Sequence, residues 1–329
     1  MACDVKIYIN TIKTVGNIGF GCPLILEENA ETAKDYAVYT DVSELVTAGY
    51  AVDSDVYKVA QLMFMQEYPP QKIAVCSTTD EASKWVAEEK NVSKDWRQLV
   101  VLGASTPSVS DIMTAIEAQT KYPKFYYANV PLEYAETLTV EGIERTLVCF
   151  YTPTEDLPVP VAAIAGNVGG CQVGSYTINN MKIKGVPALE LSDTEISAIH
   201  AKGGVTMVLS AGDCVVSEGK AVGGTYVDNT DNNDYIKQQL EYKLQKVFND
   251  NLKVPYTNEG IAMLEGATVD VLKDAYNKGI IENGYTVDFK TREEVSEDER
   301  STRKYTGGKI TYSMQGAIHE IEVYCECKL

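Results

Sequence analysis

The chain has 329 residues, which is enough for one large domain or two ordinary ones with a buried core. Its formal net charge is −18 and its pI is near 4.6, and an acidic surface disfavours direct binding to nucleic acid or to anionic lipid. With 45% apolar residues and no run of about eighteen apolar residues in a row, the composition is typical of a globular protein and not of a membrane-spanning one.

The N-terminus reads as an extended strand. Apolar and polar residues alternate over residues 5–9, which places Val5, Ile7 and Ile9 on one face. A glycine-punctuated stretch, 15–21, follows. We therefore predict an N-terminal arm, residues 1–21, that leads into the fold.

From about residue 40 to residue 157, helix and strand patterns alternate. Strands are predicted at 72–77, 98–102, 124–128 and 145–151, and helices at 56–64, 80–90 and 108–120. Strand-helix-strand repetition at this spacing implies a largely parallel sheet covered by helices. Residues 22–157 are accordingly predicted to form an α/β domain.

The region 158–304 has a mixed pattern that predicts an α+β domain. A short apolar helix at 161–165 is followed by a glycine-rich stretch that we expect to be a flexible loop, 166–174. Further on we predict a strand-like segment at 175–183, helices at 193–201, 233–249 and 258–278, strands at 205–210, 214–217 and 285–289, and a charged, solvated loop at 292–304.

The last segment, residues 305–329, reads as a strand-forming arm. Ile310, Tyr312 and Met314 share one face, and the parity then switches at Gln315-Gly316, which predicts a bulge or turn there. The apolar positions after the switch are Ile318, Ile321 and Val323. The terminal strands either pair inside their own domain or add to the sheet of another chain.

Searches for catalytic, cofactor and metal motifs assign no residue. The two histidines, His200 and His319, lack an accompanying nucleophile motif, and no glycine pattern fits a phosphate loop. Cys325-x-Cys327 reads as an apolar strand face, and Asp228–Asp234 as a solvated turn that caps the next helix, not as a calcium loop. The eight cysteines are expected to be reduced thiols of a cytoplasmic protein, because the chain is not small and opens without a signal peptide.

The order of several short motifs carries a family resemblance. Leu191–Glu195 opens a helix, Gly223–Asp228 precedes the first long helix, Pro255–Ile261 precedes the second, and Gly316–Ile321 opens the closing strand. In this order they resemble the sheath subunits of contractile phage tails and related injection particles. The resemblance covers about residues 160–329 well and the first third of the chain only in architecture.

The resemblance implies a structural subunit, not an enzyme, and no cofactor. Copies would stack helically around an inner tail tube, with baseplate and terminator proteins at the two ends. The terminal arms would donate strands to neighbours, and rigid-body rearrangement would shorten the sheath and drive the tube through a target envelope. The particle would be a virion tail or a phage-tail-like device assembled in the bacterial cytoplasm.

Some points stay open at the level of sequence. Lys273 and Lys278 on the second long helix are candidates for contact with the tube. The alternatives to a sheath subunit are an α/β enzyme with an unidentified carboxylate site and another self-assembling shell or tube protein.

Overall fold

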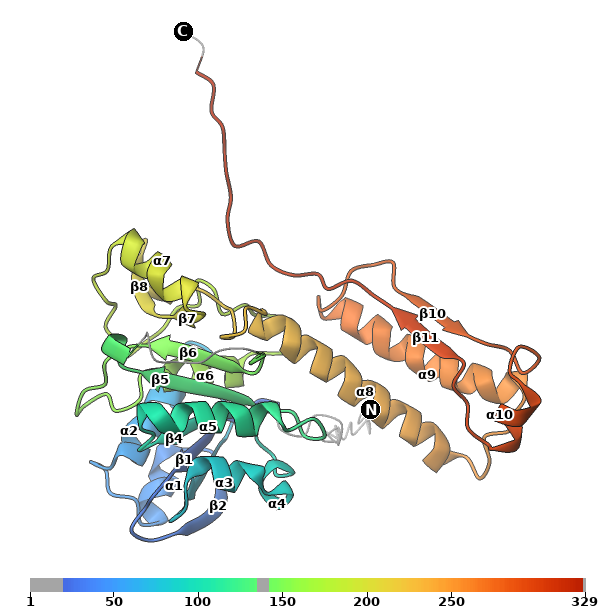
Figure 1. The fold of residues 1–329 in the computed structure, drawn as a ribbon, viewed down its shortest axis with the longest axis horizontal. Helices are drawn as coiled ribbons and strands as arrows, with labels where there is room; N and C mark the ends of the chain where they lie inside the picture. The colour runs from blue at the N-terminus through green and yellow to red at the C-terminus, as the bar shows by residue number, and fades with distance from the viewer. Residues whose placement is uncertain (1–19, 135–141, 328–329) are drawn as a thin grey trace, which may run out of the picture.

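The computed structural model describes residues 20–134 and 142–327. These residues form a large unit, residues 20–226, a small unit, residues 227–315, and an extended C-terminal segment that runs away from both (Figure 1). The predicted N-terminal arm, with Val5, Ile7 and Ile9, lies outside the described residues apart from its last two positions.

A sheet of seven strands forms the centre of the large unit, in the order β2-β3-β1-β4-β5-β6-β7. Neighbouring strands run parallel, except that β2 is antiparallel to β3. The predicted helix-covered mixed sheet is confirmed. The strands are β1 (Leu24–Glu27), β2 (Lys34–Tyr39), β3 (Ile73–Ser77), β4 (Gln98–Leu102), β5 (Phe125–Val130), β6 (Thr146–Phe150) and β7 (Gly204–Val205).

Both faces of this sheet are buried, which is why its strands read as continuous apolar runs. Successive residues point to opposite faces, so Ile25 packs in one core cluster while Leu24 and Leu26 pack in the other. The first cluster includes residues of α1 (Val42–Thr47), α2 (Asp55–Phe64) and α6 (Ala162–Gly170). The second includes residues of α3 (Ala82–Ala87), α4 (Glu89–Val92), α5 (Thr106–Glu117) and α7 (Asp193–Ala201).

The glycine-rich stretch after residue 165 is helical, so the predicted flexible loop is wrong over residues 166–170. Its glycines serve close packing. A Cβ on Gly166 would lie 2.6 Å from the Cα of Met63, and one on Gly170 would lie 1.9 Å from the carbonyl oxygen of Tyr68. Absent side chains therefore let α6 lie directly against α2 and the turn that follows it.

Two smaller predictions also need correction. The predicted helix 80–90 is divided into α3 and α4, because Glu88 between them has extended backbone. The strand-like segment 175–183 forms a single bridge, between Lys182 and Val215, and no strand. A 3-10 turn, η2 (Leu132–Tyr134), and a hairpin of β8 (Met207–Ser210) and β9 (Asp213–Val216) complete the large unit.

The small unit is built on two long helices that pack side by side, α8 (Val227–Asp250) and α9 (Asn258–Asn277) (Figure 1). Thr257 caps α9 by accepting a hydrogen bond from the amide of Gly260 at 3.4 Å. A two-stranded antiparallel sheet, β10 (Thr286–Phe289) with β11 (Gly308–Thr311), lies against α9, and a short helix, α10 (Glu297–Ser301), interrupts the predicted loop 292–304.

The predicted boundary between residues 157 and 158 falls within the large unit. Residues on both sides of it belong to one sheet and one core, because α6 and β7 come after it. The chain passes from the large to the small unit along α8. None of the helices in the described ranges combines the length and apolar character that a membrane crossing requires.

Candidate assembly surfaces

The C-terminal segment leaves the body at Gly316 and is exposed along nearly its whole described length. Gly316 has a φ of 65°, a left-handed conformation that favours glycine, at the position where the sequence predicts a bulge or turn. Beyond it, Ile318, Ile321 and Val323 are 91%, 82% and 78% exposed. A strand-like segment with bare apolar side chains and unpaired backbone is a ready partner for another sheet.

The residues predicted as strand positions fall into two groups. Ile310 lies in β11, where it pairs with Val287, and Met314 bridges to Ile281. Tyr312 is half-buried beside them. These three positions therefore pack inside their own chain, whereas the positions after Gly316 have no strand partner in the part of the chain that the structure describes.

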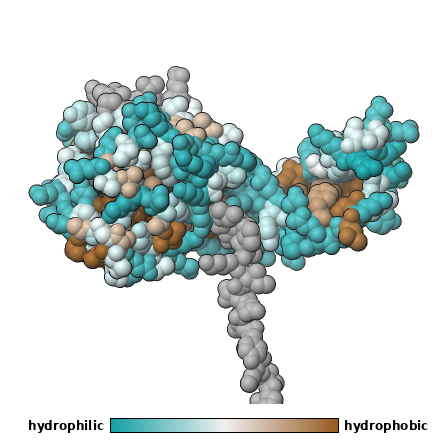
Figure 2. Space-filling model, turned by 90° about the horizontal axis from the view of Figure 1, so that it is seen from below, coloured by the Kyte–Doolittle hydropathy of each residue, from teal (hydrophilic) through white to brown (hydrophobic). Residues whose placement is uncertain are grey.

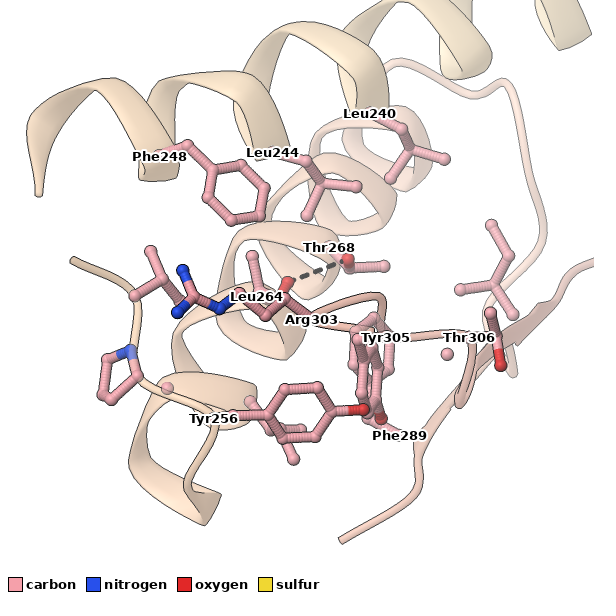
Figure 3. Close-up of a pocket in the computed structure, with 16 residues that line it drawn as sticks. Leu240, Leu244, Phe248, Tyr256, Leu264, Thr268, Phe289, Arg303, Tyr305 and Thr306 are labelled. Carbon is pink, nitrogen blue, oxygen red and sulfur yellow. Dashed lines mark hydrogen bonds between the residues drawn. The ribbon is translucent and has the colours of Figure 1, made fainter. Parts of the chain in front are cut away.

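An apolar groove of about 440 Å³ lies in the small unit, between the last turns of α8 and the strand β11 (Figure 3). Leu240, Leu244 and Phe248 point into it from α8, and Phe289 and Tyr305 face them from the other side. Figure 2 shows the same unit from below, with apolar side chains gathered on an otherwise largely hydrophilic surface.

The apolar stripe of α8 explains why this groove is open. Its first members, Tyr235 and Ile236, are buried, but Leu240 and Leu244 are only half-buried and Phe248 is 51% exposed. The sheet that would cover the later turns has only two strands, and Ile310 of β11 already lines the groove. A further strand beside β11 would lie over this uncovered stripe.

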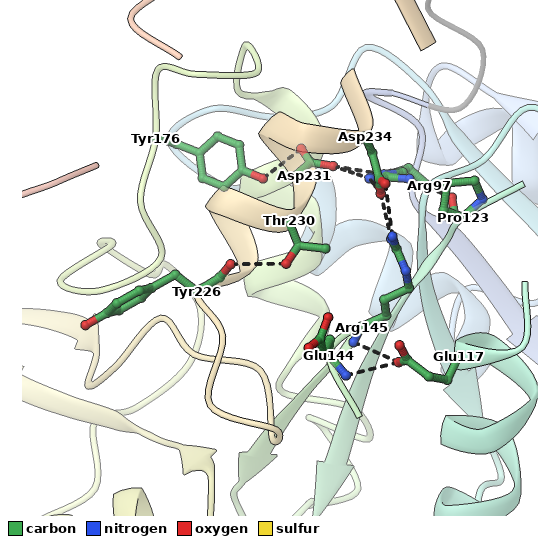
Figure 4. A network of polar contacts seen from close by, with 10 residues as sticks. All are labelled: Arg97, Glu117, Pro123, Glu144, Arg145, Tyr176, Tyr226, Thr230, Asp231 and Asp234. Carbon is green, nitrogen blue, oxygen red and sulfur yellow. Dashed lines mark hydrogen bonds and ion pairs between the residues drawn. The ribbon is translucent and has the colours of Figure 1, made fainter. Parts of the chain in front are cut away.

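A buried cluster of charged side chains fixes the start of α8 to the large unit (Figure 4). Arg97, which directly precedes β4, donates hydrogen bonds to Asp231 at 2.9 Å and to Asp234 at 2.6 Å. Arg145 pairs with Asp234 at 2.6 Å, and the hydroxyl of Tyr176 donates to Asp231 at 3.0 Å. We call this cluster the α8 clamp.

The clamp corrects the prediction of a solvated turn at Asp228–Asp234. These residues are helical, and Asp231 and Asp234 lie on one face because they are three positions apart. Burial by itself raises the pKa of Asp234, but the Arg145 and Arg97 guanidinium groups hold that pKa below its usual range. The charges of two arginines and two aspartates cancel, so the start of the helix is buried without an unpaired charge.

A buried amine lies beside the clamp. The ammonium group of Lys124 donates to the carbonyl oxygen of Lys94 at 3.1 Å and to that of Trp96 at 2.5 Å. Burial, together with the charge of Arg97, lowers the pKa of Lys124 to about 7.

Because the unfolded chain keeps this proton up to its ordinary pKa of 10.5, stability should rise with pH between 7 and 10.5. We expect the free energy of unfolding to gain about 1.5 kcal/mol between about pH 7 and pH 8.5 from this group. Urea unfolding of the unchanged chain and of Lys124→Met at the two pH values checks this prediction. The variant should lack the gain in the free energy of unfolding, and an equal gain in both proteins would contradict the assignment.

The two candidate tube-contact lysines differ in their surroundings. Lys278 forms an ion pair with Asp274 at 2.6 Å and a hydrogen bond to the hydroxyl of Tyr235, so its charge is already engaged. Lys273 is exposed on α9. Of the two, Lys273 is the better placed to meet a partner.

The usual ligand position of an α/β sheet is occupied by the chain itself. Ligands of such folds bind where the strand order reverses, here at the carboxyl ends of β1 and β4. At that point the Glu28 carboxylate accepts hydrogen bonds from the Ala82 amide at 2.8 Å and the Ser108 hydroxyl at 3.5 Å. Among the described residues, no group of three or more potential ligands is placed to hold a metal.

Sequence reasoning did not find the groove or the clamp. The groove residues Leu240, Leu244 and Phe248 read as an ordinary buried helix stripe, because nothing in the sequence says that the sheet above them has too few strands. The clamp had a usable signal: Asp231 and Asp234 share a helix face once the helix is allowed to begin at Val227.

One family model matches part of the chain. Residues 227–288 match the family model described as the E217 tail sheath protein gp31-like C-terminal domain. No curated protein is similar in sequence at the level required for a match.

Solved structures match over almost the whole chain. A chain of the contracted helical sheath of the anti-feeding prophage has a TM-score of 0.73 at 14% identity and covers 99% of both chains. A chain of that particle's baseplate has a TM-score of 0.71 at 14% identity, over 100% of this chain and 99% of its own. A chain of the contracted PVC sheath, from an extracellular contractile injection system, has a TM-score of 0.71 at 11% identity, over 99% and 98%.

The likeness to these structures shows the fold. The resemblance to contractile tail sheath proteins is thereby confirmed, for the architecture over the whole chain and for the sequence over residues 227–288.

Proposed function

We propose that this chain is a structural subunit of a contractile sheath that polymerises helically, without enzymatic activity of its own. The observation that carries the proposal is that one chain holds both an exposed, unpaired extended segment and an apolar groove beside the free edge of a two-stranded sheet. The C-terminal segment is the donor, and the groove beside β11 is the acceptor.

Donor and acceptor do not pair with each other in this structure. The segment leaves the body close to the first turn of α8, where His319 contacts Tyr226, whereas the groove lies along the last turns of the same helix. Figure 1 shows the segment running away from the small unit. A contact between different surfaces of identical chains is head-to-tail, and when it does not close it generates a helix.

The acceptor suits an added strand. A neighbour's segment that pairs with β11 would place Ile321 and Val323 on one face and Glu320 and Glu322 on the other, since side chains alternate along a strand. The apolar face would cover Leu244 and Phe248, and the acidic face would remain in water.

The remaining partners follow from the family resemblance. The subunit would surround an inner tail tube, contacted through α9 at Lys273, and would meet baseplate and terminator proteins at the ends of the sheath. It would act in a virion tail or a phage-tail-like particle assembled in the bacterial cytoplasm. The anti-feeding prophage and PVC chains come from a helical sheath and a sheath complex, which supports helical self-assembly for this chain as well.

Electron microscopy of the purified chain, alone and with its inner tube protein, tests the function. We expect hollow tubes of stacked rings, because the described part of each subunit carries a donor segment and an acceptor groove. Particles that stay monomeric in the presence of the tube protein would contradict the proposal and would favour the enzyme alternative.

A further inference from the structure

His319 joins the exposed C-terminal segment to the large unit. Among the described residues from 315 to 327, it alone is half-buried and all others are exposed. Its Nε2 atom lies 3.1 Å from the hydroxyl oxygen of Thr177, and its ring meets that of Tyr226 edge-on at 4.9 Å between centroids.

The surrounding groups set the direction of this hydrogen bond. The Thr177 hydroxyl also hydrogen-bonds the Asp228 carboxylate, which is an acceptor only. The threonine proton therefore goes to Asp228, and the threonine oxygen accepts from the Nε2–H of His319. A ring protonated at Nε2 satisfies this arrangement in both its neutral and its charged form.

The ring lies at an open cavity of about 660 Å³ with mixed charge. The titratable groups around this cavity are Asp228 and Tyr226 from the start of α8, Glu218 and Lys220 from the loop after β9, His200 from α7, and Glu320 from the segment itself. Acidic groups outnumber basic ones around this cavity.

The backbone before His319 is free to pivot. A Cβ on Gly316 would meet no atom within 4 Å, and the side chains of Ala317 and Ile318 are exposed. The last fixed points before it are the Met314 bridge to Ile281 and the Gln315 amide, which donates to the Ile280 carbonyl oxygen at 3.1 Å. Within the described residues from 316 to 327, the side-chain hydrogen bond and ring contact with the body are therefore those of His319.

We propose that His319 is a latch that sets where the free C-terminal arm begins. With the ring seated on Thr177 and Tyr226, the arm starts at Glu320. With the ring released, it starts at Gly316 and gains four residues, or about 13 Å of extended reach. The use of that reach between neighbouring subunits rests on the proposed sheath function; the latch itself is a property of the single chain.

Backbone ¹⁵N relaxation of the isolated, full-length chain tests the latch. We expect residues 316–318 to be as ordered as the body and residues 322–327 to move on the fast timescale of a free tail. In His319→Leu, residues 316–318 should acquire the same fast motion as 322–327. The matched control is His200→Leu, which removes the other histidine from the same cavity and should change nothing in the segment.

Two outcomes would overturn the latch: fast motion of residues 316–318 in the unchanged chain, or unchanged order of these residues in His319→Leu. NMR spectra of the imidazole rings give a second test of the latch, because the chain has only two histidines and their signals are easily told apart. Thr177→Val should move the His319 resonance toward that of free histidine, and no movement would count against the hydrogen bond. Because all of these measurements use single chains, a failure to form tubes refutes the sheath proposal and leaves the latch result standing.

Discussion

A chain that ends at Gly316 is expected to fold as a monomer and to form no tubes. The residues removed, from Ala317 onward, are exposed apart from His319, so the large and small units lose little packing. Assembly loses its donor strand, with the main-chain hydrogen bonds and the apolar face that the strand supplies. Electron microscopy shows whether tubes form. Thermal unfolding tests whether the large and small units are intact, and its midpoint should be close to that of the full chain.

Point variants separate the two faces of the donor strand. Burying Ile321 and Val323 in a neighbour's groove should contribute about 1.5–3 kcal/mol each. The double variant Ile321→Lys, Val323→Lys should therefore weaken association by a factor of about 100 or more. The matched control, Glu322→Lys, places the same charge on the opposite face and should assemble. Equal loss in both variants would mean that charge, and not the apolar face, governs assembly.

Mixing variants tests the head-to-tail arrangement directly. A chain truncated at Gly316 keeps its groove, and Leu244→Glu with Phe248→Glu keeps its donor segment while blocking the groove. Each alone should stay monomeric. Mixed in equal amounts they should form pairs that grow no further, visible by sedimentation. Long polymers from the mixture would contradict a single donor and a single acceptor per chain.

The second large effect is expected at the α8 clamp. Arg97→Met leaves the Asp231 carboxylate, whose side chain is 3% exposed, without its cationic partner. Breaking a buried pair from one side costs about 3–5 kcal/mol, so the melting midpoint of a chain of this length should fall by about 4–7 °C. Urea and thermal unfolding measure both quantities.

Two further variants identify the cause of that loss. Adding Asp231→Leu to Arg97→Met removes the stranded charge and should recover part of the stability. The control is Lys246→Met, which breaks an exposed pair with Asp250 at 2.9 Å and should cost no more than about 1 kcal/mol. If the double variant is no more stable than Arg97→Met, the loss comes from packing and not from the unpaired carboxylate.

The clamp also bears on how a sheath subunit would move. The five side chains of the clamp, three of them buried, join α8 to the residues that precede β4 and β6 and to the loop at Tyr176, so the first turns of the helix are held to the large unit. We expect both units to move together, with changes of connection confined to the terminal segments. Arg97→Met in assembled particles should then loosen the small unit without removing the donor segment.

Periodic local patterns determined much of this fold from sequence alone. The helix at Asp55–Phe64, the strand at Gln98–Leu102 and the helix at Asp193–Ala201 were predicted within a few residues, because each has a clear cap or a continuous apolar run. The apolar positions Ile318, Ile321 and Val323 can also be read from the sequence, whereas the strand pairing expected of them stays a prediction. β1 was missed, although it lies in the middle of the sheet, because four residues carry too little periodicity.

Only the tertiary structure decided which of these apolar and charged side chains are buried by other parts of the chain. Gly166 and Gly170 look like a loop until α2 is packed against them, and Asp231 and Asp234 look solvated until Arg97 and Arg145 arrive from distant strands. In the same way Phe248 reads as core, and its exposure follows from the absence of a third strand beside β11 in the described chain. The physical reason is that burial and pairing depend on which distant segments meet, whereas periodicity depends on the chain next to each residue.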